Sequence, residues 1–208
     1  MTKPATSRKP PVSPGRGRPR EFDTQTVLAC ASEVFWNHGY HATSVDDLCK
    51  ATGVLRGSLY GVFGDKHGLL LAALDHYADG SIARLAERLN ANVPPEEALR
   101  NALMHHARAA SALNAQRSCF ITNATLEMSA DDIALRERIE CIQRRTITLL
   151  SAAVIRGQAS GAFNAKLDEK AVGEFLLCIT QGLRVLDKTP RDEQQLTSIV
   201  DLAMRALV

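Results

Sequence analysis

The stretch GYHATSVDDLCKATGVLRGSLYGVFGDK, residues 39–66, decides the fold of this chain. Ser44 and Asp47 stand three residues apart before an apolar position, the spacing of a capping box that begins a helix. Gly53 then allows the left-handed backbone of a tight turn, and a second short helix is expected over residues 56–63. Two short helices joined by a glycine-centred turn predict a helix-turn-helix module.

Helical signals continue on both sides of this module. Toward the N-terminus, Asp23 is an N-cap signal, and apolar residues at helical spacing predict a helix that ends near Gly39. Toward the C-terminus, Asp65 is expected to cap a long helix that reaches Leu89, and Pro94-Pro95 marks a break. The chain is therefore predicted to be all-α, with further helices over residues 96–114, 118–128, 131–159, 168–187 and 192–207.

Composition limits the class of protein and its location. Hydrophobic residues make up 45% of the chain and aromatic residues only 5%, a balance typical of helical globular proteins. The apolar run at residues 68–74 is far shorter than the roughly 20 residues of a membrane span, and no signal-peptide segment is evident. We therefore expect a cytoplasmic protein with no membrane partner.

Neither the cysteines nor the histidines have the spacing of a metal site. The five cysteines are widely spaced without a Cys-x-x-Cys pair, which argues against a zinc site or a disulfide framework. His105 and His106 are adjacent, so they are expected to face different sides of a helix and to make a poor metal set with Cys119. We expect no catalytic residues, no metal and no cofactor.

The first 20 residues differ from the rest in charge. They hold six basic side chains and no acidic one, so their charge of +6 leaves −4 for the remainder of a chain of net charge +2. This basic arm contains five prolines and is predicted to be disordered in isolation. Its Arg-Gly-Arg-Pro core is similar to an AT-hook, in which arginines enter a narrow A·T-rich minor groove. The predicted minor-groove contacts are Arg16, Arg18 and Arg20.

Residues 17–77 resemble the DNA-binding domain of the TetR family of bacterial regulators. The resemblance rests on a set of residues at fixed spacing: Gly39-Tyr40, Thr43-Ser44, Leu48, Gly53-Val54, Ser58-Leu59-Tyr60, Phe63 and Asp65-Lys66. It implies a homodimer with a helix-turn-helix DNA-binding domain over residues 21–66 and a helical ligand-sensing and dimerisation domain over residues 67–208. The GRPREFD segment from residue 17 and Phe35-Trp36 are similar to a branch that includes electrophile-responsive repressors.

The second helix of a helix-turn-helix module lies in the major groove with its N-terminal residues at the base edges. Arg56 is therefore expected to contact guanine, Gly57 to allow close backbone approach, and Ser58 to reach a base or a phosphate. The resemblance implies that Tyr60 and Lys66 bind phosphates. Further contacts to the DNA backbone are expected from the hydroxyls and amides of Thr43 and Ser44.

Cys119 is the candidate sensor residue. Ser118 is an N-cap signal, so Cys119 is expected in the first turn of a helix, where the dipole favours a thiolate that reacts with electrophiles. The similar branch commonly has Gly-Cys-Leu where this chain has Ser118-Cys119-Phe120. The alternative is that Cys119 is a packing residue beside a non-covalent ligand. The expected walls of that pocket are Met104, Phe120, Asn123, Leu177 and Gln181.

The last two helices carry an apolar face that is expected to form the dimer interface, with Val172, Phe175, Ile179, Leu183, Ile199 and Ala203. The predicted function is a regulator, a repressor released from a palindromic double-stranded DNA operator by a small ligand or a thiol-reactive electrophile. Two alternatives stay open. The length of chain beyond the DNA-binding module argues against an architectural DNA-binding protein without a sensor, and the missing acid–base or metal set argues against a helical enzyme.

Overall fold

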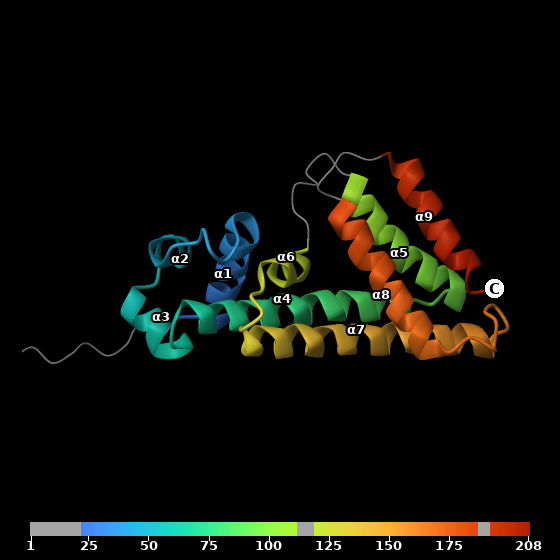
Figure 1. The fold of residues 1–208 in the computed structure, drawn as a ribbon, viewed down its shortest axis with the longest axis horizontal. Helices are drawn as coiled ribbons and strands as arrows, with labels where there is room; N and C mark the ends of the chain where they lie inside the picture. The colour runs from blue at the N-terminus through green and yellow to red at the C-terminus, as the bar shows by residue number, and fades with distance from the viewer. Residues whose placement is uncertain (1–21, 112–118, 187–191) are drawn as a thin grey trace, which may run out of the picture.

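The computed structural model describes residues 22–111, 119–186 and 192–208, and these ranges contain helices and no strands (Figure 1). The helices are α1 Thr24–His38, α2 Val45–Thr52, α3 Arg56–Phe63, α4 Lys66–Leu89, α5 Pro95–Ser111, α6 Phe120–Glu127, α7 Ile133–Ala159, α8 Glu169–Leu186 and α9 Glu193–Arg205. The predicted all-α class is confirmed. Arg16, Arg18, Arg20 and Ser118 lie outside the described residues.

Short polar side chains begin α1, α2 and α4. Asp23 caps α1, and Ser44 and Asp47 form the predicted capping box at the start of α2. Asp65 accepts a hydrogen bond of 2.7 Å from the backbone N–H of Gly68 at the start of α4. Each carboxylate or hydroxyl satisfies an N–H group that helix geometry leaves without a partner. The module is therefore built on local signals.

Two apolar clusters hold the chain together. The first joins α1 to α4 with α6 and the start of α7, and Phe35, Leu48 and Leu59 are buried within it. The second joins the end of α4 with α5, α8, α9 and the later part of α7. Full burial of one such large side chain contributes about 1.5–3 kcal/mol, so each cluster fixes the relative positions of its helices.

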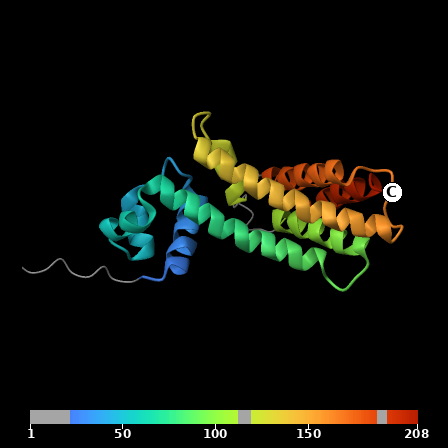
Figure 2. The same cartoon turned by 90° about the horizontal axis from the view of Figure 1, so that it is seen from below.

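The long helices α4 and α7 run side by side along the molecule (Figures 1 and 2). α4 begins at Lys66 beside the helix-turn-helix module and ends at Leu89 within the second cluster. The predicted domain boundary after residue 66 therefore coincides with the start of α4, and this one helix joins the two apolar clusters. In the part of the chain that the structure describes, no helix is long and apolar enough to cross a membrane.

The apolar face of α8 and α9 is rotated from the predicted one. Leu183 and Ala203 are 1% and 2% exposed, so the expectation that they meet a second subunit is wrong. They are buried inside the protomer, where α8 packs on α7 and α5 and α9 packs on α5. Val172, Ile179 and Ile199 are half-buried against the second cluster. Of the predicted residues, Phe175 stays on the outward apolar surface, which also includes Cys178 and Val185 on α8 and Leu202 on α9.

Candidate nucleic-acid interface and adjoining cavity

Helix α3 is anchored on one face and open on the other. Leu59 is fully buried, whereas Arg56 and Gly57 are exposed and Ser58 and Tyr60 are half-buried. The Arg56 guanidinium carbon lies 5.3 Å from the centroid of the Tyr60 ring. This cation–π contact between residues one turn apart restricts the rotamers of Arg56. The helix therefore presents a partly ordered cation on its open face.

Apolar side chains on this surface were not expected from the sequence. Leu55, the N-cap residue of α3, is 80% exposed and makes no side-chain capping hydrogen bond, and Val62 is 57% exposed. The available signal was a leucine at a position where a polar cap is usual. An exposed leucine beside Arg56 suits apolar contact with a thymine methyl group.

The residues predicted to contact the DNA backbone differ in their exposure and side-chain contacts. Thr43 is 2% exposed and its hydroxyl donates to the Gly39 carbonyl at 2.6 Å, so its predicted side-chain contact with DNA is wrong; the hydroxyl closes the turn between α1 and α2. Ser44 is exposed, and its hydroxyl takes part in the capping box. Lys66 holds its Nζ 4.4 Å from the Tyr40 ring centroid at the start of α4.

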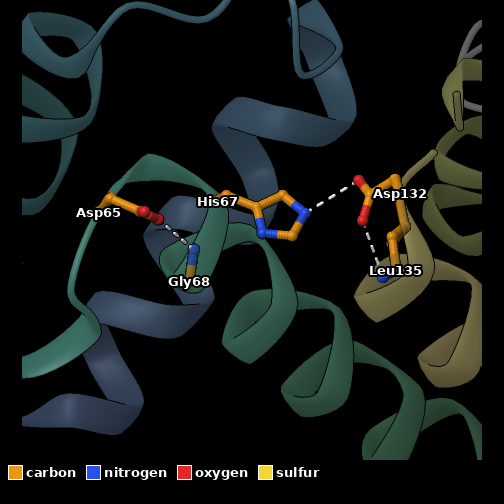
Figure 3. A network of polar contacts seen from close by, with 5 residues as sticks. All are labelled: Asp65, His67, Gly68, Asp132 and Leu135. Atoms are coloured by element: carbon orange, nitrogen blue, oxygen red, sulfur yellow. Dashed lines mark hydrogen bonds and ion pairs between the residues drawn. The ribbon is translucent and has the colours of Figure 1, made fainter.

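Two polar contacts fasten the module to α6 and α7. The backbone N–H of Tyr40 donates to Glu127 Oε2 at 2.7 Å. Nε2 of His67 lies 2.9 Å from one carboxylate oxygen of Asp132, whose other oxygen accepts from the N–H of Leu135 at the start of α7 (Figure 3). A small cavity of about 150 Å³ lies at this joint. Two of the predicted pocket residues line it, namely Phe120 and Asn123.

A larger cavity of about 250 Å³, hereafter the main cavity, is lined by residues of α1, α4, α5, α6, α7 and α8 and by Cys119. The predicted residues Leu177 and Gln181 also line it. Met104 does not: it is 4% exposed and packs in the second apolar cluster. Sequence reasoning missed three arginines of this wall, Arg84, Arg88 and Arg184, and the aromatic residues Trp36 and Tyr77.

His105 and His106 both line the main cavity, with ring centroids 5.6 Å apart. The expectation that they face different sides of α5 is therefore wrong. Adjacent helical positions diverge by only about 100°, so a cavity that borders one edge of the helix reaches both rings.

Cys119 is the N-cap residue of α6, one position before the first turn in which it was expected. The residue is 4% exposed, and the Tyr77 hydroxyl lies 3.9 Å from its Sγ. Burial, followed by the neighbouring Cys119, raises the pKa of Tyr77 to about 12, so this hydroxyl keeps its proton at neutral pH. Cys119 therefore stands in the cavity wall beside a hydrogen-bond donor.

Comparison with known proteins agrees with this arrangement. Residues 27–73 match the family described as bacterial regulatory proteins, tetR family, and residues 95–203 match the tetracyclin repressor-like, C-terminal domain. The chain is 34% identical over 199 residues to the HTH-type transcriptional repressor ComR of Escherichia coli (strain K12), covering 93% of each chain. It is 32% identical over 175 residues to the transcriptional regulator AcuR of Cereibacter sphaeroides, covering 79% of this chain and 78% of that one. A cysteine variant of the TetR family regulator CifR, solved with 26-base-pair operator DNA, is similar with a TM-score of 0.78 at 29% identity, covering 91% of this chain and 99% of that one.

Proposed function

The chain belongs to the TetR family of bacterial regulatory proteins, and on this basis we propose that it is a homodimeric repressor, released from its operator by a small ligand or a thiol-reactive electrophile. The observation that carries the proposal is the main cavity, because Trp36 of α1 and Cys119 both form part of its wall. A signal that enters the cavity thus contacts the helix-turn-helix module directly. An architectural protein without a sensor has no use for such a cavity.

DNA recognition is assigned to the open face of α3. A bidentate contact from Arg56 to a guanine edge contributes about 1–3 kcal/mol of discrimination. The operator complex of the similar regulator CifR supports double-stranded DNA as the partner. The remaining proposed contacts are Ser44, Gly57, Ser58, Tyr60 and Lys66 from the module and Arg16, Arg18 and Arg20 from the arm.

The second protomer is placed against the outward apolar surface of α8 and α9, since a four-helix bundle would cover Phe175, Val185 and Leu202. A two-fold dimer can present two α3 helices to successive major grooves, about 34 Å apart. Phe175→Asp is therefore expected to yield monomers in analytical ultracentrifugation. Leu126→Asp, at an equally apolar residue that is 68% exposed on α6, is the matched control and is expected to leave the dimer intact.

Helix α6 is the proposed route from the main cavity to DNA. Cys119, at its N-terminal end, belongs to the cavity wall, and Glu127, at its C-terminal end, accepts from the N–H of Tyr40. Its eight residues span about 12 Å. A ligand or adduct that displaces the Cys119 end moves the carboxylate that holds the turn between α1 and α2. In a dimer this movement alters the spacing of the two α3 helices.

The experiment that tests the proposal measures binding of the reduced protein to DNA upstream of its own gene, before and after N-ethylmaleimide. Cys141 is exposed, whereas Cys178 lies on the surface proposed to meet the second protomer, so the assay uses a background in which Cys141 alone is serine. Release that disappears when Cys119→Ser is added would establish a thiol trigger. Specific binding that ignores the reagent would keep the repressor and assign the cavity to a non-covalent ligand. No sequence-specific binding would contradict the proposal.

A further inference from the structure

The main cavity is lined by a concentration of positive charge. Arg84 and Arg88 lie one turn apart on α4, and Arg184 reaches the same cavity from α8. No aspartate or glutamate occurs among the described residues that line it. Guanidiniums gathered against low-dielectric walls repel one another. Arg84 is exposed, whereas Arg88 and Arg184 are half-buried, so the positive charge of these two residues favours an anionic ligand in the cavity.

Several other arginines of the described chain have carboxylate partners, whereas Arg136 and Arg156 donate to backbone carbonyls. Ion pairs join Arg138 to Asp75, Arg145 to Asp79 and Arg100 to Asp201. Within the described ranges, no ion pair links a carboxylate to any of the three cavity arginines. Nη1 of Arg88 donates instead to the backbone carbonyl of Arg84 at 3.1 Å. The Arg88 guanidinium is thus satisfied in part by a neutral group.

The two histidines respond to this environment. Burial, followed by Arg184, lowers the pKa of His106 to about 3. Burial, followed by Arg88, also lowers the pKa of His105. The imidazole of His106 is therefore neutral at neutral pH. The fixed positive charge of the cavity comes from guanidiniums, and the imidazole serves as a neutral hydrogen-bonding group.

The rest of the wall is largely apolar and includes Trp36, Leu85, Leu103, Ile142, Leu150 and Leu177. The volume of the main cavity, about 250 Å³, falls just below the roughly 300–1,000 Å³ typical of sites for drug-sized ligands. The dimensions favour a compact molecule that combines a charged group with a short hydrocarbon part.

We infer that the main cavity binds a compact organic carboxylate, whose charge meets Arg88 and Arg184 while its hydrocarbon part packs against Trp36. This inference rests on the proposed function, because it names the chemical class of the releasing ligand. Arginine presents parallel N–H donors that match the two oxygens of a carboxylate. A phosphate monoester offers similar oxygens, so it forms a separate arm of the test.

Trp36 gives a direct readout, since it is the only tryptophan in the chain and lines the cavity. Its fluorescence is to be titrated with hexanoate and cyclohexanecarboxylate, with the corresponding neutral amides, with hexylammonium and with hexyl phosphate. At least one carboxylate should give a saturable change, with its amide binding at least about tenfold more weakly. No response to either carboxylate, or equal binding of an acid and its amide, would overturn the inference. Tighter binding of hexyl phosphate would replace the carboxylate by a phosphate.

Variants test which residues hold the charge. Arg88→Gln and Arg184→Gln should each weaken carboxylate binding about tenfold or more. Arg184→Lys keeps the charge and should retain part of the affinity, which separates charge loss from misfolding. Arg144→Gln, at an exposed residue of α7 that does not line the cavity, is the matched control. Unchanged affinity in both glutamine variants would contradict the inference.

The fluorescence titration needs no DNA, so it separates this inference from the proposed function. Carboxylate binding without operator release would support the ligand class and contradict the proposed signalling. Operator release by neutral or cationic compounds alone would support the signalling and overturn the ligand class.

Discussion

Gly39→Ala is expected to destabilise the chain severely, because Gly39 meets two demands at once. Its φ of 78° and ψ of 167° fall in a region that glycine alone adopts readily, and other residues pay about 1–3 kcal/mol of strain there. A Cβ at this position would lie 2.5 Å from Glu127 Oε1. The carboxylate would have to move and would lose its hydrogen bond from the N–H of Tyr40. A hydrogen bond to a charged group contributes about 1.5–3 kcal/mol, so the expected total is about 2.5–6 kcal/mol.

A double-mutant cycle separates the two contributions. Glu127→Ala alone should cost only the hydrogen bond, about 1.5–3 kcal/mol. In that background Gly39→Ala meets no carboxylate and should add only the backbone strain. The double variant should therefore be about as stable as Gly39→Ala alone, which leaves an interaction energy of about 1.5–3 kcal/mol.

The assay is urea unfolding followed by circular dichroism at one fixed protein concentration, because dimer formation couples stability to concentration. Gly161→Ala is the matched control: Gly161 also has a φ of +78°, but no atom lies within 4 Å of its added Cβ. Additivity of the two single variants within about 0.5 kcal/mol would refute the reasoning. Equal costs for Gly39→Ala and Gly161→Ala would do the same.

Three further predictions concern DNA binding and pH. Arg56→Ala is expected to weaken operator binding by about 1–3 kcal/mol in fluorescence anisotropy, whereas Arg205→Ala, at the end of α9, should leave it unchanged. The pKa of His106 falls from 6.5 to about 3 on folding, so the unfolded chain takes up the proton more readily. The free energy of unfolding should therefore drop as pH falls from 6.5 toward 3, by up to about 1.4 kcal/mol per pH unit. His106→Asn should remove that part of the pH dependence in urea titrations. Deletion of residues 1–20 is expected to weaken operator binding and to flatten its dependence on salt, since fewer counterions are released; an unchanged salt slope would exclude phosphate contacts by the arm.

The helices of the N-terminal module were predictable because local capping and turn residues set their boundaries. Ser44 and Asp47 cap α2 through contacts within three residues, and Gly53 ends that helix with a φ of 68°. Asp65 begins α4 in the same local way. These helix boundaries follow from such local contacts and need no knowledge of tertiary packing. Thr43 shows the limit: its burial depends on how the turn closes on the Gly39 carbonyl.

Which face of α8 is buried was not predictable, because the spacing of apolar residues does not say which neighbouring helix covers which face. Gly173 is packed so closely on α7 that a Cβ there would lie 2.4 Å from the Ser151 hydroxyl. This close approach rotates Leu183 into the core and leaves Phe175 on the surface. The arginines of the main cavity escaped notice for a related reason. Arg88 and Arg184 are distant in sequence, and each by itself reads as an ordinary solvated charge on an amphipathic helix.

Under the proposed function, a ligand alters operator binding only through a difference in its affinity for the DNA-bound and released conformations. A tenfold fall in operator affinity requires about 1.4 kcal/mol, less than the roughly 1.5–3 kcal/mol of one hydrogen bond to a charged group. A single guanidinium–carboxylate contact that exists in one conformation is therefore sufficient. Arg88 and Arg184 lie on different helices, so a relative movement of α4 and α8 that closes this pair around a carboxylate supplies the difference. Besides the proposed route through α6, the same movement would displace Lys66 at the other end of α4, and with it the adjoining α3.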